Sequence, residues 1–200
     1  MIFTQYMNVF FKKSLYYIIV LKIQYGIILL NRRDIMKEEN NRRINRNAVD
    51  NANYIIQYFN KKNQEITYQM LNRLMYLYEA IYMSVTDEDC LFNENFYANS
   101  FEIDNEEYQK EYKGYGNLPI EINTKDDYDN GVVNKMVVIA LYSLFHKWTL
   151  AELISFTTRE GSPWDNLKKQ NNNIIPKEAK IDKAETRNWF KKMVEIDESK

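Results

Sequence analysis

The chain has 200 residues, of which 45% are hydrophobic and 14% aromatic, enough for one domain with a substantial core. Three prolines and five glycines are few for an all-β fold with many tight turns, so a mainly α fold is expected. The formal net charge of -1 provides no global attraction to nucleic acid. The single cysteine, Cys90, excludes an internal disulfide and fits a reducing compartment, which we take to be the cytoplasm.

Residues 1–35 are an apolar N-terminal extension. The stretch 15–30 is mostly apolar, but a lysine and a glutamine interrupt it, and it is shorter than the roughly 20 residues that a membrane-spanning helix needs. Three interpretations stay open: a weak anchor, an extra helix docked on the domain, or a misassigned translation start. We favour a start at Met36, because Arg32-Arg33 encoded as AGG-AGG would be a ribosome-binding sequence. A membrane partner is expected only if residues 1–35 are translated.

Residues 36–47 are a polar lead-in to a helical domain that we place at 48–196. Its first helix has one apolar stripe, formed by Val49, Ala52, Ile55, Ile56 and Phe59. Thr67 is expected to cap the next helix, with Ile66 and Leu71 as a hydrophobic staple. The inward face of this long helix comprises Leu71, Leu74, Met75, Tyr78, Ile81 and Tyr82.

The middle of the chain is irregular. Residues 85–104 have no helical period, so we predict a loop, with at most a small β hairpin or short strands near 96–122. A short helix is expected over 106–112 and a short strand over 119–122. The acidic run 126–131 does not have the ligand register of a calcium loop and is interpreted as a connection to the next helix.

The C-terminal third is predicted to be mostly helical, with a loop at 171–173, and the domain is expected to have about six helices in all. Residues 132–148 are apolar almost all round; their length favours a buried central helix, and their valine and isoleucine content leaves a strand as the alternative. Thr149 and Glu152 form a capping box that starts another helix. A last amphipathic helix is expected over 184–194, with its inward side formed by Trp189, Phe190 and Met193.

A corner follows the capping box. Gly161 suits a left-handed backbone past the helix end. Ser162 is expected to be the N-cap of a new helix, with Pro163 at its first position and Trp164 in its first turn. A corner capped in this way is more often architecture than chemistry.

Three segments resemble the Panacea antitoxin domain in the family's own order. The corner from Trp148 to Trp164 is similar to its C-terminal signature, a leucine-rich helix followed by Thr-His and then Pro-Trp. Leu-Asn-Arg-Leu-Met-Tyr at 71–76 resembles Leu-Gln-Lys-Leu-Leu-Tyr, and Phe96 with Ala98 matches part of Phe-x-Ala-Trp. The matched positions form a structural signature: Leu71, Leu74, Tyr76, Phe96, Thr158, Pro163 and Trp164.

The chain departs from the family pattern at three places. Asn99 stands where the family has tryptophan, residues 102–104 replace Gly-Pro-Val, and Thr158 stands where histidine is usual. A Gly-Pro turn fixes backbone shape in a way that Glu-Ile does not, so these changes bear on the loop geometry and on partner choice.

The resemblance implies a phage-associated antitoxin of a toxin–antitoxin system. Such a protein neutralises a cognate protein toxin by direct protein–protein interaction, or acts as a proteolytic adaptor that delivers the toxin to a cytoplasmic protease. No enzymatic activity, cofactor or metal is expected. The candidate partner-binding residues lie in the irregular region and at the corner. They are Tyr97, Asn99, Phe101 and Tyr108 in the irregular region, and Arg159 at the corner. The alternative interpretation is that these aromatic side chains pack the loop onto the core and do not contact a partner.

Two alternative functions stay open beside the antitoxin: an enzyme and a DNA-binding regulator. The one histidine, His146, is interpreted as a hydrogen-bonded or positive group near a helix end, and a metal site would need several His or Cys ligands. No Gly-x-Ser-x-Gly motif or glycine-rich phosphate loop occurs. A hydrolase or transferase built on carboxylates remains open, as does a helix-turn-helix DNA-binding regulator, although Asp165 facing phosphates argues against the latter.

Overall fold

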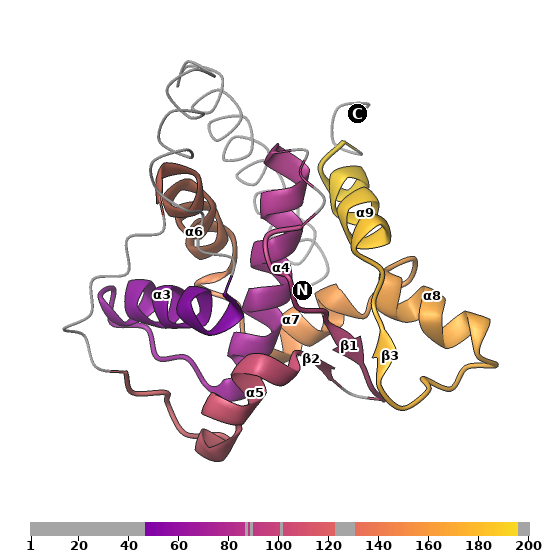
Figure 1. Cartoon of the computed structure of the whole chain (residues 1–200), viewed down its shortest axis with the longest axis horizontal. Helices are drawn as coiled ribbons and strands as arrows, with labels where there is room; N and C mark the ends of the chain where they lie inside the picture. Colours follow the sequence, from indigo (N-terminus) through magenta and orange to yellow (C-terminus); the bar gives the residue numbers. More distant parts are fainter. Residues whose placement is uncertain (1–46, 87, 89, 101, 123–130, 196–200) are drawn as a thin grey trace, which may run out of the picture.

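The computed structural model describes residues 47–86, 88, 90–100, 102–122 and 131–195. In these residues the fold is mainly α, with seven α-helices and one small three-stranded antiparallel sheet (Figure 1). The predicted fold class is confirmed. The predicted extension 1–35, the lead-in before Asn47, Phe101 and most of the acidic run 126–131 lie outside the described residues.

The first two helices begin after residues whose side chains accept hydrogen bonds from free backbone N–H groups of the first helical turn. Helix α3 (Ala48–Asn60) is capped by Asn47, whose side chain accepts from the backbone N–H groups of two following residues. A left-handed Asn63, with φ of 58°, turns the chain after it. Helix α4 (Tyr68–Thr86) follows Thr67, whose hydroxyl accepts from the Met70 N–H at 3.4 Å.

The central helix is α4, and the prediction that 132–148 would be central is wrong. All side chains from 71 to 83 of α4 are buried, and the helix packs against α3, α6, α7, α9 and β2. Helix α6 (Gly131–Phe145) covers one side of α4 and leaves Ile139 49% exposed (Figure 1). The polar residues of α4 make this helix look half-exposed in the sequence, but in the structure they are buried together with its apolar residues.

The sheet is formed by three two-residue strands in the order β2-β1-β3. Strands β1 (Tyr97–Ala98) and β2 (Ile103–Asp104) make the hairpin that the sequence allowed, and β3 (Ala179–Lys180) pairs with the other edge of β1. The pairing of β3 was not predicted, because two residues carry no readable alternation. Residues 119–122 form no strand; Pro119 makes an isolated bridge to Thr67.

The remaining helices surround this frame. Helix α5 (Glu106–Tyr112) has the predicted bounds, and a 3-10 turn, η1 (Lys113–Tyr115), continues it. Helix α9 (Lys183–Glu195) packs on α4 and buries Trp189 and Phe190, while Met193 is half-buried. The inward face predicted for the last helix is therefore confirmed.

The corner is built as predicted. Helix α7 (Leu150–Thr157) starts with the Thr149–Glu152 capping box, with both reciprocal bonds present. Gly161 has φ of 77°, and the Ser162 hydroxyl caps α8 (Pro163–Gln170) by accepting from the Asp165 N–H. Helices α6 and α7 meet at 109°, so α7 turns back across α4.

Candidate functional site

The five predicted partner-binding residues have different environments. Tyr97 and Asn99 are half-buried on the hairpin, and Arg159 is exposed on the corner. Tyr108 is fully buried on α5, so it packs the core and offers no surface to a partner. Phe101 lies outside the described residues. Tyr108 is therefore excluded from the predicted partner-binding surface, because its side chain packs in the core.

Asn99 shapes the hairpin turn. Its side-chain oxygen accepts from the Glu102 N–H at 2.7 Å, and its own N–H donates to the Glu102 carbonyl at 3.0 Å. Its carbonyl accepts from the indole N–H of Trp164 at 3.1 Å. Asn99 therefore closes a tight turn, and Trp164 connects that turn to the corner.

The side chains of Thr158 and Arg159 make their contacts within the corner and with α9. The Arg159 guanidinium lies 5.4 Å from the centre of the Phe156 ring and donates to the Met193 sulfur at 3.5 Å. Thr158 donates its hydroxyl proton to the Ile154 carbonyl at 2.8 Å. Arg159 thus reaches toward α9, whereas Asn99 lies at the hairpin.

The three segments that carry the family resemblance contact one another. From α4, Arg73 donates to the Thr157 hydroxyl at 3.2 Å at the end of α7. Tyr76, also on α4, packs edge-on against Phe96, with ring centres 5.6 Å apart. The Arg73 bond and the indole bond from the corner to the hairpin join residues 84 and 65 positions apart along the chain.

A small pocket of about 110 Å³ lies where α4, β2 and α7 meet. Its buried floor is formed by Asn72, Arg73 and Ile103, which are at most 2% exposed. Its half-buried rim comprises Gln69, Glu102, Leu150 and Ile154. The pocket therefore combines a polar floor with apolar walls from the corner helix.

Arg73 is a buried cation with acidic neighbours. Burial lowers the pKa of its guanidinium to about 10, and the carboxylates of Glu102 and Asp104 oppose this shift. A group with that pKa is still protonated near neutral pH. The positive charge in the floor is thus balanced by two negative charges close to it.

Asp104 is the second buried charge of this region. Its carboxylate accepts from the Tyr68 hydroxyl at 2.8 and 2.9 Å, from the Gln109 amide, and from the Asn105 N–H at 2.9 Å. Burial is the main reason that the pKa of Tyr68 is raised well above its usual value, so this hydroxyl stays a donor. Several donors to one carboxylate are what a buried charge requires.

Two side chains near Arg73 make no such bonds. Among the described residues, neither amide atom of Asn72 has a hydrogen-bond partner, and the Tyr108 hydroxyl has none either. A buried polar group left unpaired costs about 1–3 kcal/mol. Asn72 is 1% exposed and lies beneath the pocket, with both amide atoms out of contact with solvent.

Sequence reasoning missed Asn72 and Arg73. The helical period places Leu71, Leu74 and Met75 inward and leaves the polar pair for solvent, whereas α4 is surrounded on all sides. One signal was present: the pair sits inside the segment that resembles the family signature, between residues that had to be core.

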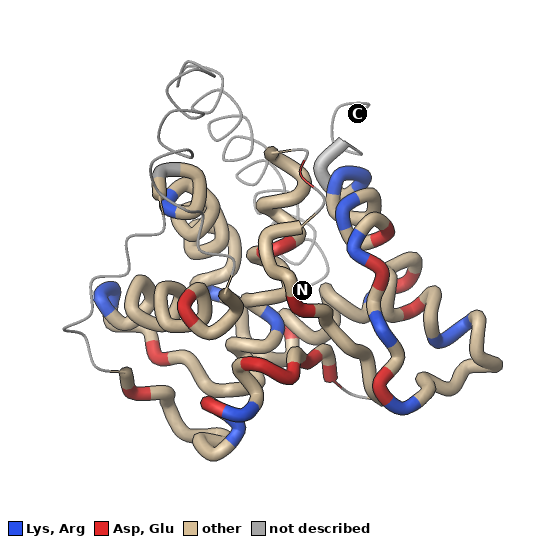
Figure 2. Tube along the Cα trace, viewed as in Figure 1, with Lys and Arg blue, Asp and Glu red and all other residues tan. Residues whose placement is uncertain are grey.

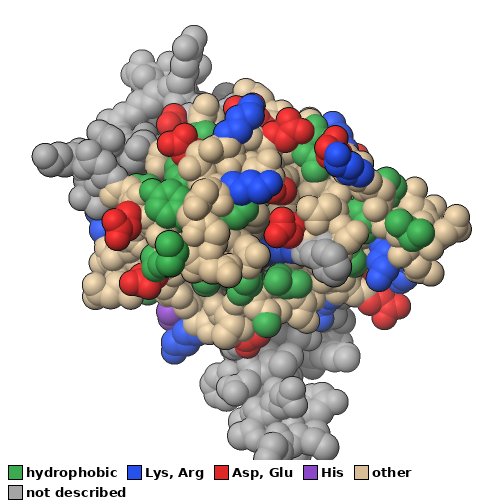
Figure 3. Space-filling view, turned by 90° about the horizontal axis from the view of Figure 1, so that it is seen from below, with side chains coloured by type: hydrophobic (Ala, Val, Ile, Leu, Met, Phe, Trp, Pro, Cys, Tyr) green, Lys and Arg blue, Asp and Glu red, His purple; other side chains and the backbone are tan. Residues whose placement is uncertain are grey.

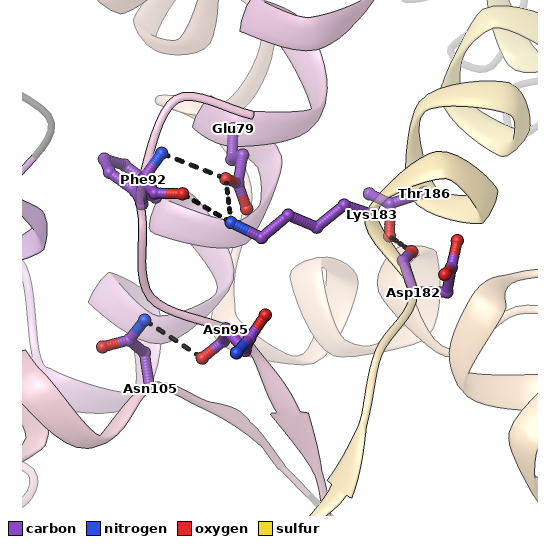
Figure 4. A network of polar contacts seen from close by, with 7 residues as sticks. All are labelled: Glu79, Phe92, Asn95, Asn105, Asp182, Lys183 and Thr186. Atoms are coloured by element: carbon purple, nitrogen blue, oxygen red, sulfur yellow. Dashed lines mark hydrogen bonds and ion pairs between the residues drawn. The ribbon is translucent and has the colours of Figure 1, made fainter. Parts of the chain in front are cut away.

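A second buried polar cluster lies further along α4 (Figure 4). Glu79 accepts from the Phe92 N–H at 3.2 Å and from the Lys183 ammonium at 3.0 Å, and Lys183 also donates to the Phe92 carbonyl at 2.6 Å. Burial raises the pKa of Glu79, and Lys183 opposes this. Here each charged group points at its partner, and the cluster fixes the segment before β1 to α4 and α9.

The remaining sequence expectations concern metal ligands, His146 and membrane segments. No group of three or more His, Cys, Asp or Glu residues in the described part of the chain is placed to hold a metal ion. The His146 ring is 2.9 Å from the Tyr142 carbonyl through Nδ1 and stacks on the Tyr142 ring, as expected for a hydrogen-bonded group at a helix end. Within the described ranges no single helix has the length and apolarity to cross a membrane, although bent α6 and α7 meet the criteria as a pair.

The fold and the pocket define a mainly α domain whose central helix presents a polar floor between a hairpin and a capped corner. Compared with protein-family models, curated proteins and solved structures, the chain matches none.

Proposed function

We propose that this chain is an antitoxin that neutralises a cognate protein toxin by binding it directly. The observation that carries the proposal is the contact among the three segments that resemble the Panacea domain. Arg73 of the first bonds Thr157 of the third, and Trp164 of the third bonds Asn99 of the second. Residues of one functional unit are expected to lie close together, so these contacts support the proposal.

A binding module also needs a rigid frame beneath its surface, because ordering a loop on binding consumes affinity. The corner is closed by two side-chain caps, and the hairpin turn is closed by Asn99. Tyr97, half-buried on the hairpin, and Arg159, exposed on the corner, are of the residue types that dominate binding energy at interfaces.

The formal net charge of -1 gives this chain no overall charge that would direct it to a polyanion. Acidic and basic side chains alternate along the trace, most clearly on α9 (Figure 2). The face seen from below carries acidic, basic and hydrophobic side chains next to one another (Figure 3). A surface mixed in this way favours a protein partner with its own mixed surface over nucleic acid.

The test is co-expression with the protein encoded beside this one. Growth should be inhibited by that neighbour alone and restored when this chain is co-expressed, and the two proteins should co-purify. Arg159→Glu should weaken rescue, whereas Lys177→Glu, a charge reversal at a side chain that is 91% exposed, should not. Lack of rescue with both proteins soluble would contradict the proposal.

Direct neutralisation and proteolytic delivery differ in one measurable quantity. If binding alone neutralises the toxin, its cellular level stays constant during rescue, and rescue persists in a host that lacks its cytoplasmic proteases. If this chain is an adaptor, the toxin level falls and rescue fails in such a host. We expect the first result, because the proposal rests on binding contacts.

A further inference from the structure

Helix α6 is apolar almost all round, but it packs on the domain with one side only. Its inward side carries Val137, Val138 and Leu141, which are 0% exposed, and it covers α4 on the side opposite α9 (Figure 1). A soluble helix that is apolar all round is normally buried all round. Ile139 is nevertheless 49% exposed, so the outward side of α6 is an apolar face that the described residues leave open.

The exposed isoleucine belongs to a stripe and is not an isolated surface residue. Met136 and Tyr142 are half-buried, and each lies three residues from Ile139 on the same side of the helix. The Tyr142 ring packs edge-on against Tyr58 of α3, with ring centres 5.6 Å apart, and His146 stacks on the Tyr142 ring at 4.7 Å. From Met136 to His146 this stripe is about 15 Å long, at 1.5 Å per helical residue.

The cations beside the stripe have no acidic partner among the described residues. No aspartate or glutamate occurs in residues 131–151, and α6 is drawn without an acidic position (Figure 2). The Lys62 ammonium lies 5.4 Å from the centre of the Tyr58 ring and 5.7 Å from that of the Tyr142 ring. Lys147, just past the end of the stripe, is exposed. Neither lysine forms an ion pair within the described part of the chain.

This charge distribution decides between two occupants that the chain itself could supply. A second copy would place one positively charged patch against another, because a two-fold contact uses the same surface on both subunits. The chain's own apolar segment 15–30 contains no acidic residue and is flanked by two basic pairs, so it also adds positive charge. Like charges brought together at an interface cost free energy. The occupant that complements this surface is therefore apolar and acidic.

A membrane and a nucleic acid complement the surface less well than a protein does. Binding in a bilayer interface requires an apolar face that sinks below the headgroups, whereas Met136 and Tyr142 are half-buried beside Ile139. Nucleic acid is bound mainly through many contacts between cations and phosphates, and this surface is an apolar stripe with a few lysines at its edge.

We infer that the outward face of α6, from Met136 through Ile139 to Tyr142, binds an acidic amphipathic helix of a protein partner. A straight stripe along one helix is complemented by the apolar side of a second helix packed beside it. The carboxylates of that helix pair with Lys62 and Lys147. Lys62 is already oriented by two tyrosine rings, so it loses less side-chain freedom when it pairs.

The acidic helix belongs to the toxin of the function proposed above, and this assignment of the partner rests on that function. The preference of the α6 face for an acidic amphipathic helix does not depend on it. Synthetic peptides test the preference on this chain alone, whereas growth rescue tests the function. Either result can therefore fail while the other succeeds.

The experiment is a titration of the full-length chain, followed through the methyl signals of Met136 and Ile139. The probe is a helical peptide of about four turns with leucines along one side and glutamates elsewhere. One comparison peptide has lysines in place of the glutamates, and another has the original residues in an order without helical period. The probe should give a saturable shift, and each comparison peptide should bind about tenfold more weakly. Equal binding of the lysine peptide, or no saturable shift with the probe, overturns the inference.

Two pairs of variants test whether the probe binds on this face. Ile139→Lys removes the apolar centre of the stripe and keeps the positive sign, so it should weaken binding about tenfold. Ile174→Lys is the matched control, because Ile174 is 69% exposed in the loop after α8, and it should leave binding unchanged. Lys62→Glu should weaken binding, whereas Lys177→Glu, at a side chain that is 91% exposed elsewhere, should not. If Ile139→Lys does not fold, the lysine pair decides. Equal effects within a pair overturn the inference.

The other occupants give results of their own. If residues 1–35 cover the face, a chain that begins at Met36 binds the probe more tightly than the full-length chain does. If a second copy covers it, Ile139→Lys converts a dimer into a monomer in sedimentation. If a membrane covers it, vesicles of phosphatidylcholine and phosphatidylserine bind the full-length chain more tightly than the probe does, and Ile139→Lys abolishes that binding. Each of these results overturns the inference.

Discussion

Two buried polar clusters lie on the same helix, α4, and they differ in how completely their groups are paired. Around Glu79, the carboxylate, the Lys183 ammonium and both backbone groups of Phe92 bond one another. Around Arg73, the guanidinium and Asp104 have partners, but Asn72 and the Tyr108 hydroxyl do not. The first cluster is fully paired among the described residues, and the second contains buried groups without hydrogen-bond partners.

This difference assigns different roles to two similar-looking regions. A fully paired cluster joins elements and gains nothing from a ligand. A cluster with unpaired buried groups lowers the stability of the fold by about 1–3 kcal/mol for each such group. Burial alone does not distinguish them, because Glu79 and Arg73 are both 2% exposed.

The largest effect is expected from breaking the complete cluster. Lys183→Met leaves Glu79 buried without its cation, and losing one partner of a buried pair costs about 3–5 kcal/mol. Chemical denaturation at neutral pH should show this fall in the free energy of unfolding. The double variant Lys183→Met with Glu79→Gln should recover much of it. If the free energy of unfolding falls by no more than the contribution of an exposed ion pair, the Glu79 cluster does not stabilise the fold.

The pH dependence of that loss has a definite sign. Burial raises the pKa of Glu79 in the folded state, so folding favours its protonated form. Stability that depends on this group is present below the ordinary carboxyl pKa and declines as pH rises through the raised folded value. Without Lys183, which lowers this pKa, the decline should be larger and extend to higher pH. Lys183→Met should therefore be least destabilising in acid.

A smaller loss is expected within the incomplete cluster. Tyr68→Phe removes a hydroxyl that donates to both oxygens of the buried Asp104, and hydrogen bonds to charged groups contribute about 1.5–3 kcal/mol. The control is Tyr115→Phe, whose hydroxyl donates to the Glu121 carbonyl at the surface. It should change the midpoint of denaturation little, so similar losses for both variants would contradict the ranking.

The next effect has the opposite sign. Asn72→Leu and Asn134→Leu each remove a buried amide with no partner, and each should raise the free energy of unfolding by about 1 kcal/mol, provided that the leucine fits. Calorimetry would measure both. A loss of stability for Asn72→Leu alone would show that its amide is paired inside the protein and that the two clusters do not differ.

The sequence predicted those parts of this fold that have a local cause. The caps at Thr149 and Ser162, the left-handed Gly161 and the bounds of α5 follow from neighbouring residues, and the structure confirms them. The central position of α4 and the pairing of β3 depend on contacts between distant segments. The pocket depends on the same kind of contact, so Asn72 appears polar and external in the sequence and is buried in the fold.

The smallest effect tests the link between the corner and the pocket rim. Trp164→Phe keeps an aromatic ring but removes the indole donor to Asn99, whose side chain holds the Glu102 N–H. One neutral hydrogen bond contributes about 0.5–1.5 kcal/mol, and we expect the lower half of that range because Trp164 is half-buried. Hydrogen exchange should quicken at the Glu102 amide and remain unchanged at the Phe92 amide, which belongs to the complete cluster. Equal acceleration at both amides would mean that the corner stabilises the whole domain, and that the rim of the pocket has no separate support.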